Sequence, residues 1–126
     1  MKKTLLIAAA LVCSGAAQAD SFFCETVGWS STNQSGAYTG DVDEIWIVDS
    51  DKGWKLAGTD DYEGVCEYIK LGERDALECK NTEGPFLSGD IFRYEFTIWL
   101  GSTNDFVKLN RHSGSVDAYS GRCTEI

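Results

Sequence analysis

Few side chains in this chain have the types and spacing that catalysis needs. His112 is the only histidine, and Ser113 follows it directly. A serine nucleophile would also need an acid such as Asp117 to orient the histidine. Neighbouring residues on a tight turn rarely converge in that way, and the sequence has no nucleophile elbow. We therefore interpret His112 as a histidine on an exposed turn and predict no catalytic residues.

Pairs of carboxylates could in principle perform the acid–base chemistry of a glycosidase. Examples are Asp41 with Asp43 and Asp60 with Asp61. Such pairs are numerous, and the sequence does not show which of them are buried or suitably separated. The chain is predicted to be a non-enzyme, with a small secreted hydrolase that uses a carboxylate pair as the alternative.

The segment Asp49-Ser50-Asp51-Lys52-Gly53 resembles the opening of a calcium-binding loop, because two carboxylates alternate before a glycine. The third ligand at the regular spacing and the distant glutamate of such a loop are absent. Asp and Gly are also the residues that tight turns favour. We predict a turn, with no metal and no cofactor, and keep a calcium-stabilised structural domain as a further alternative.

Aromatic residues give a stronger signal for binding than any side chain gives for catalysis. The chain has four tryptophans, five tyrosines and six phenylalanines. Alternation over residues 91–100 places Trp99 and Arg93 opposite the apolar face of that strand. An exposed tryptophan in a polar face is typical of a binding hot spot. We predict a partner-binding surface that includes Trp99, Arg93 and Tyr38, with burial of Trp99 under a loop or in a closed barrel as the alternative.

The first nineteen residues have the features of a bacterial export signal. A positive start, Met1-Lys2-Lys3, precedes an apolar run and the small-residue site Ala17-Gln18-Ala19. Cleavage after Ala19 leaves one domain, residues 20–126, and a periplasmic or secreted location. Lipid modification of Cys13 is the alternative, although Val12 stands where a small residue is usual.

The predicted mature chain is strongly acidic. The formal net charge of the whole sequence is −9 and becomes −11 on cleavage, because Lys2 and Lys3 leave and no acidic residue does. This charge repels nucleic acid and anionic membrane surfaces and favours cationic partners. We expect a basic protein or a glycan as the partner and exclude nucleic acid. We also expect a monomer with no transmembrane segment in the mature chain.

Cleavage also leaves an even set of cysteines, which in an exported chain predicts two disulfides. The set is Cys24, Cys66, Cys79 and Cys123. In Leu71-Gly72-Glu73-Arg74, glycine stands where a two-residue type II′ turn needs positive φ. A ladder that pairs Leu71 with Arg74 places Cys66 opposite Cys79. This register predicts Cys66–Cys79 and, by elimination, Cys24–Cys123; a helical turn over residues 74–80 is the alternative to the hairpin.

Strand signals recur along the chain between clusters of turn residues. They are strongest over residues 21–27, 43–48, 54–57, 91–100, 106–110 and 115–120, whereas residues 28–40 are predicted to be mostly loop. No stretch has a sustained helical period. The sequence therefore predicts one all-β domain, an antiparallel meander that forms a barrel or sandwich of about six to eight strands.

The C-terminal segment contains the turn Asn110-Arg111-His112-Ser113-Gly114 and the terminal Gly121-Arg122-Cys123. In these features it resembles small exported bacterial disulfide-bonded β-domain proteins of uncharacterised function. The likeness covers about the last fifth of the chain. It implies a β-domain with a C-terminal disulfide and carries over no catalytic residue.

A looser resemblance is to small periplasmic lysozyme inhibitors, which are also disulfide-bonded β-barrels. Ser35-Gly36-Ala37-Tyr38 corresponds only in part to their inhibitory loop. Size, export signal and acidic charge together predict an exported acidic binding module. Its sharpest version is an inhibitor of a basic cell-wall hydrolase.

Overall fold

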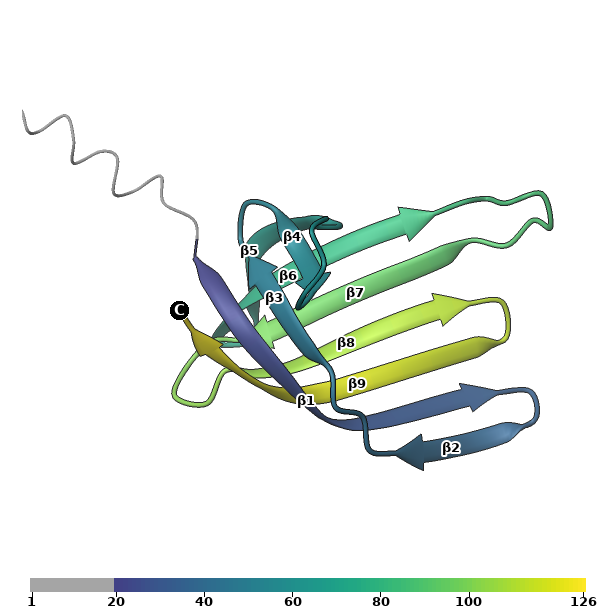
Figure 1. Ribbon diagram of the computed structural model, residues 1–126, viewed down its shortest axis with the longest axis horizontal. Coiled ribbons are helices and arrows are strands. Elements are labelled where there is room, and N and C mark those ends of the chain that lie inside the picture. Colours follow the sequence, from purple (N-terminus) through teal and green to yellow (C-terminus); the bar gives the residue numbers. More distant parts are fainter. Residues whose placement is uncertain (1–19) are drawn as a thin grey trace, which may run out of the picture.

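The computed structural model describes residues 20–126, so the predicted export signal and Cys13 lie outside the described residues. Figure 1 shows that the described chain is built from strands. Their bounds are β1 (Ser21–Asn33), β2 (Gly36–Gly40), β3 (Ile45–Asp49), β4 (Gly53–Leu56), β5 (Val65–Leu71), β6 (Arg74–Glu83), β7 (Phe92–Trp99), β8 (Asp105–His112) and β9 (Ser115–Glu125). The prediction of an all-β fold is confirmed.

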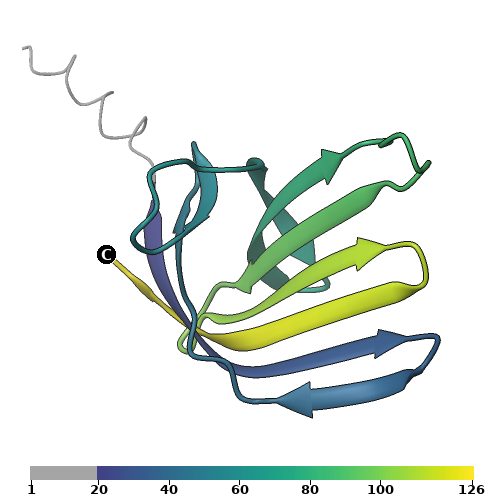
Figure 2. The ribbon, with the colours of Figure 1, turned by 45° about the vertical axis from the view of Figure 1, so that its right-hand side comes forward.

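Eight strands form one antiparallel path in the order β4-β3-β1-β9-β8-β7-β6-β5, and β2 pairs beside it with the second half of β1. The strands from β5 to β9 are a meander of consecutive neighbours. The sheet curls strongly, and the two views in Figures 1 and 2 show its two end strands turned toward each other. The fold is therefore a nearly closed barrel, one of the two architectures that the sequence predicted.

Within residues 20–126, no helix is long and apolar enough to cross a membrane.

The predicted hairpin and both predicted disulfides are confirmed. Leu71 pairs with Arg74 and Cys66 with Cys79, and Gly72 has the positive φ of 67° that the turn requires. Residues 74–80 belong to β6, which excludes the helical alternative. Cys24–Cys123 joins β1 to β9, and Cys66–Cys79 joins β5 to β6. The two disulfides are consistent with an oxidising extracytoplasmic location.

The prediction that residues 28–40 are mostly loop is wrong. β1 continues to Asn33 and β2 follows after a tight turn, in which the Asn33 side chain accepts a hydrogen bond from the backbone N–H of Ser35 at 2.7 Å. Ser31 pairs with residues of both β2 and β9 and is buried. Neighbours on both sides stabilise a polar strand that its own sequence does not favour.

The core occupies one half of the inner face of the barrel. It consists of Phe22, Cys24, Val48, Trp54, Leu77, Cys79, Phe96, Ile98, Phe106 and Cys123. Phe96 lies at its centre, with ring centroids 5.0 Å from Phe106 and 6.2 Å from Trp54. The other half of the inner face faces the end where the β1–β2, β6–β7 and β8–β9 connections lie (Figure 1). We call this the open end.

One side-chain contact joins the edge strand β5 to the residue before β1 across the curled sheet. The Tyr68 hydroxyl on β5 donates to the carboxylate of Asp20, directly before β1. Burial, followed by the hydrogen bond to Asp20, raises the pKa of Tyr68 to about 12. The neutral tyrosine is therefore the form that the fold favours.

We predict that Tyr68→Phe lowers the free energy of unfolding by about 0.5–1 kcal/mol at pH 7, because a half-exposed hydrogen bond is lost. The native contribution is present below the unfolded pKa of about 10 and is lost as the pH rises through about 12. Urea denaturation at pH 7 and pH 11 measures both effects. An equal loss at the two pH values would contradict the role of the neutral hydroxyl.

Candidate functional site

The inner face at the open end carries aromatic and charged side chains. Alternation along β8 places Lys108 and Asn110 on the same face as the buried Phe106. The ladder extends this face, with Tyr119 opposite Lys108 and Asp117 opposite Asn110. We call the surface the inner mouth, and define it by Trp29, Tyr38, Glu44, Trp46, Glu63, Glu83, Tyr94, Lys108, Asn110, Asp117 and Tyr119.

Lys108 is the centre of the inner mouth. The residue is 4% exposed, and its Nζ atom donates a hydrogen bond to Asn110 Oδ1 at 2.6 Å. The same nitrogen lies 4.6 Å from the ring centroid of Trp46, 5.3 Å from that of Tyr119 and 5.6 Å from that of Tyr94. These distances allow cation–π attraction to all three rings. The Lys108 ammonium is therefore a cation of the protein itself that lies among the aromatic rings of the inner mouth.

Four carboxylates act on these groups. Burial lowers the pKa of Lys108 from its usual 10.5 to about 8, and the negative charges of Glu44, Glu63 and Asp117 oppose that shift. The fourth, Glu83, accepts a hydrogen bond from the Tyr94 hydroxyl at 3.2 Å. Burial, followed by the charge of Glu83, raises the pKa of Tyr94. Four carboxylates against one ammonium leave the inner mouth with an excess of three negative charges.

Two buried polar atoms of the inner mouth have no hydrogen-bond partner in the described part of the chain. They are Glu44 Oε1, an acceptor, and the indole nitrogen of Trp46, a donor. A third such atom is Thr26 Oγ1. Thr26 lies next to Glu44, since its backbone N–H donates a hydrogen bond to the Glu44 carbonyl at 2.9 Å. Buried polar atoms without partners are rare in folded proteins. Because the Glu44 and Trp46 atoms are both fully buried, a partner protein could not contact them without a rearrangement of the inner mouth.

The structure does not bring the three predicted binding residues together. Tyr38 is 49% exposed and, since it pairs with Ser31, lies in the inner mouth. Arg93 and Trp99 lie on the outer face of β7, six residue steps and therefore about 20 Å apart along the strand. Arg93 is exposed, whereas Trp99 is half-buried opposite the buried Ala76.

The sequence-based interpretation overlooked most of the inner mouth. One signal for it was present, because Lys108 alternates with Phe106 and so lies on the buried face of its strand. Glu44 and Glu63 come from connections outside the strands, and no spacing in the sequence links them to Lys108.

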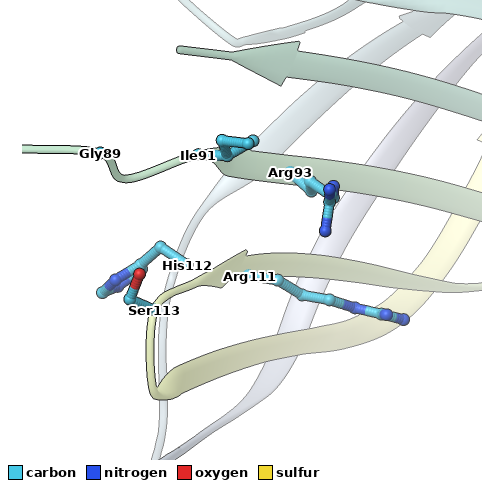
Figure 3. Close-up of a pocket in the computed structure, with 6 residues that line it drawn as sticks. All are labelled: Gly89, Ile91, Arg93, Arg111, His112 and Ser113. Carbon is cyan, nitrogen blue, oxygen red and sulfur yellow. The ribbon is translucent and has the colours of Figure 1, made fainter. Parts of the chain in front are cut away.

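A groove of about 310 Å³ lies beside the β8–β9 turn and is lined by Gly89, Ile91, Arg93, Arg111, His112 and Ser113. Figure 3 shows His112 and Ser113 together at the turn, with Arg111 extending away from them along the sheet. The His112 ring stacks on Phe92 with centroids 4.8 Å apart, and Ser113 Oγ donates to Asp90 Oδ1 at 2.7 Å. His112 is the last residue of β8 and flanks the turn, but it is partly buried, so the prediction that it is exposed is wrong.

The candidate carboxylate pairs lie on the surface. Asp41, Asp43, Asp60 and Asp61 are all exposed, which is not the environment that tunes a glycosidase acid.

The segment at residues 49–53 forms the predicted turn. Asp49 Oδ1 accepts hydrogen bonds from the backbone N–H groups of Asp51 at 2.9 Å and Lys52 at 3.1 Å. Ser21 Oγ donates to the other oxygen of Asp49 at 3.1 Å. Residues 20–126 contain no group of three or more His, Cys, Asp or Glu side chains placed to hold a metal ion.

No protein-family model, curated protein or solved structure matches this chain.

Proposed function

We propose that this protein is an exported, non-catalytic binding module that holds a basic protein partner at the inner mouth. The observation that carries the proposal is the environment of Lys108. Three aromatic rings and an excess of carboxylates surround a nearly buried ammonium. The rings and carboxylates attract cations, while burial at Lys108 itself penalises the charged form. Only one of the four negative charges is balanced from within the inner mouth, so a further cation is favoured where the surface is open to solvent.

A cationic side chain of the partner would bind outward of Lys108. Tyr38 offers a half-exposed ring there, and Asp117 and Glu63 offer carboxylates. Arginine suits this combination because its guanidinium stacks on rings and bonds to carboxylates in one plane.

The sharpest version of this function is inhibition of a basic cell-wall hydrolase. Both disulfides fit the exported compartment in which such enzymes work. The acidic charge would accelerate encounter with a basic enzyme, because opposite net charges steer two proteins together at low salt.

The test mixes the mature protein with lysozymes of the c, g and i types at low salt. Binding is measured by calorimetry and inhibition by cell-wall lysis. We predict that the double variant Asp117→Asn, Glu63→Gln weakens binding at least about tenfold, because two carboxylates of the inner mouth are neutralised. The control is Asp105→Asn, which neutralises an exposed carboxylate on the outer face, paired with Arg122 at 3.6 Å.

The control variant should keep wild-type affinity within about twofold, since exposed ion pairs contribute little. Failure of all three lysozyme types to bind would contradict the hydrolase-inhibitor version. Binding of neutral oligosaccharides at the same surface, without any lysozyme binding, would favour a glycan as the partner instead.

A further inference from the structure

The loop between β6 and β7, residues 84–91, presents apolar side chains to solvent. Leu87 is 110% exposed relative to a reference residue, and Phe86 is 49% exposed. Figures 1 and 2 show this loop projecting at the open end, near the β8–β9 turn. It begins directly after Glu83, a carboxylate of the inner mouth. A fully exposed leucine on a projecting loop is a natural anchor for a protein partner.

Hydrogen bonds fix the shape of this loop. Phe86 donates its backbone N–H to the carbonyl of Asp90 at 2.9 Å, and Gly89 donates to the carbonyl of Phe86 at 2.8 Å. Gly84 has a φ of 100°, and a Cβ there would lie 2.6 Å from the carbonyl oxygen of Asp90. The loop therefore needs glycine at its start and closes on itself.

A side-chain contact also ties the loop to the neighbouring turn. The carboxylate of Asp90 accepts hydrogen bonds from Ser113 at 2.7 Å and from Ser88 at 3.1 Å. These bonds hold the pKa of Asp90 below its usual value. Figure 3 shows the base of this arrangement, where Gly89 leads into β7 and Ser113 lies on the adjoining turn.

Aromatic rings support the loop from beneath. Phe86 packs edge-on against Phe92 with centroids 5.5 Å apart, and Phe92 stacks on His112. Half of Phe86 is thereby held against the domain while Leu87 stays free. A loop whose backbone is held in place before binding loses less conformational entropy when a partner covers it.

We infer that residues 84–91 form a preformed anchor that inserts Leu87 into an apolar pocket of the basic protein partner. This inference rests on the proposed function, because the anchor and the inner mouth would contact the same partner. The anchor supplies an apolar hot spot, and the inner mouth beside it supplies the charge that orients the partner. An anionic membrane fits less well, since the acidic chain would be repelled and only two large apolar side chains of the loop, Phe86 and Leu87, are exposed.

The test is Leu87→Asp, measured by surface plasmon resonance with a lysozyme that the wild-type protein binds. We expect dissociation at least about tenfold faster, with association changed by less than about threefold. The negative charge that Leu87→Asp adds should strengthen the attraction to a basic partner. A loss of affinity would therefore come from the lost apolar contact of Leu87. The control is Val65→Asp, which adds the same charge at a residue 79% exposed on β5, and it should bind as the wild type does.

A second variant, Ser113→Ala, keeps Leu87 but removes the tie to Asp90. It should weaken binding about threefold through the added mobility of the loop. Unchanged dissociation of Leu87→Asp from a bound lysozyme would overturn the anchor and leave the proposed function standing. Absence of binding by the wild-type protein would overturn both. If the protein binds anionic phospholipid vesicles through Leu87 and binds none of the lysozymes, the proposal of a protein partner is contradicted.

Discussion

Replacing Lys108 by methionine is expected to raise the free energy of unfolding by about 1–3 kcal/mol at pH 7. Methionine has a similar length and needs no hydration, whereas the Lys108 ammonium is nearly buried with one hydrogen-bond partner, Asn110, in the described residues. Burial lowers the pKa of Lys108 from 10.5 to about 8, which corresponds to about 3 kcal/mol of penalty on the charged form. Methionine also loses the cation–π attraction of Lys108 to the three rings, so the expected gain in the free energy of unfolding is no larger than this penalty.

The same substitution predicts a difference in pH dependence. Between pH 8 and pH 10.5 the unfolded chain keeps the Lys108 proton that the folded chain releases, so wild-type stability rises with pH from this group. Lys108→Met should lack this contribution and lose its advantage by about pH 10. Urea denaturation followed by tryptophan fluorescence at pH 7, 8 and 9 measures the effect. Parallel pH profiles for the two proteins would show that Lys108 does not bear the penalty.

Removing the Cys24–Cys123 disulfide is the other change with a large expected effect. The double variant Cys24→Ala, Cys123→Ala should lower the free energy of unfolding by about 5 kcal/mol, because the bond joins residues 99 positions apart. Cys66–Cys79 closes a loop of 13 residues, so its double alanine variant should lose about 3 kcal/mol.

Comparing the stability losses of the two double alanine variants tests whether loop length determines how much each disulfide stabilises the fold. Cys24–Cys123 fastens β1 to β9, the pair that joins the meander to the rest of the sheet. Urea denaturation of both variants under non-reducing conditions gives the comparison. A larger loss for the shorter loop would mean that local packing, and not chain entropy, dominates.

The parts of this fold that could be predicted from the sequence depend on neighbouring residues. Gly72 defines a turn, the turn defines a register, and the register places Cys66 opposite Cys79. Alternation in β7 separated Phe96 from Trp99 in the same way. Each of these arguments uses a period or spacing within one short segment.

The errors have the opposite origin. The second half of β1 is rich in serine and threonine and forms a strand because β2 and β9 pair with it from both sides. The inner mouth likewise depends on the curl of the sheet, which brings Glu44 and Glu63 close enough to act on Lys108, whereas Asp117 lies near it through the β8–β9 ladder. Contacts between distant segments have no signature in the local sequence.

The most direct test of the inner mouth is a hydrogen-exchange footprint with a bound lysozyme. Backbone amides of β8 and β9 around Lys108 and Asp117, together with those of residues 84–91, should become protected in the complex. The same experiment with the double variant Asp117→Asn, Glu63→Gln should show the protection only at higher enzyme concentration. Protection confined to the outer face around Trp99 and Arg93, with the inner mouth unchanged, would contradict the proposed binding surface.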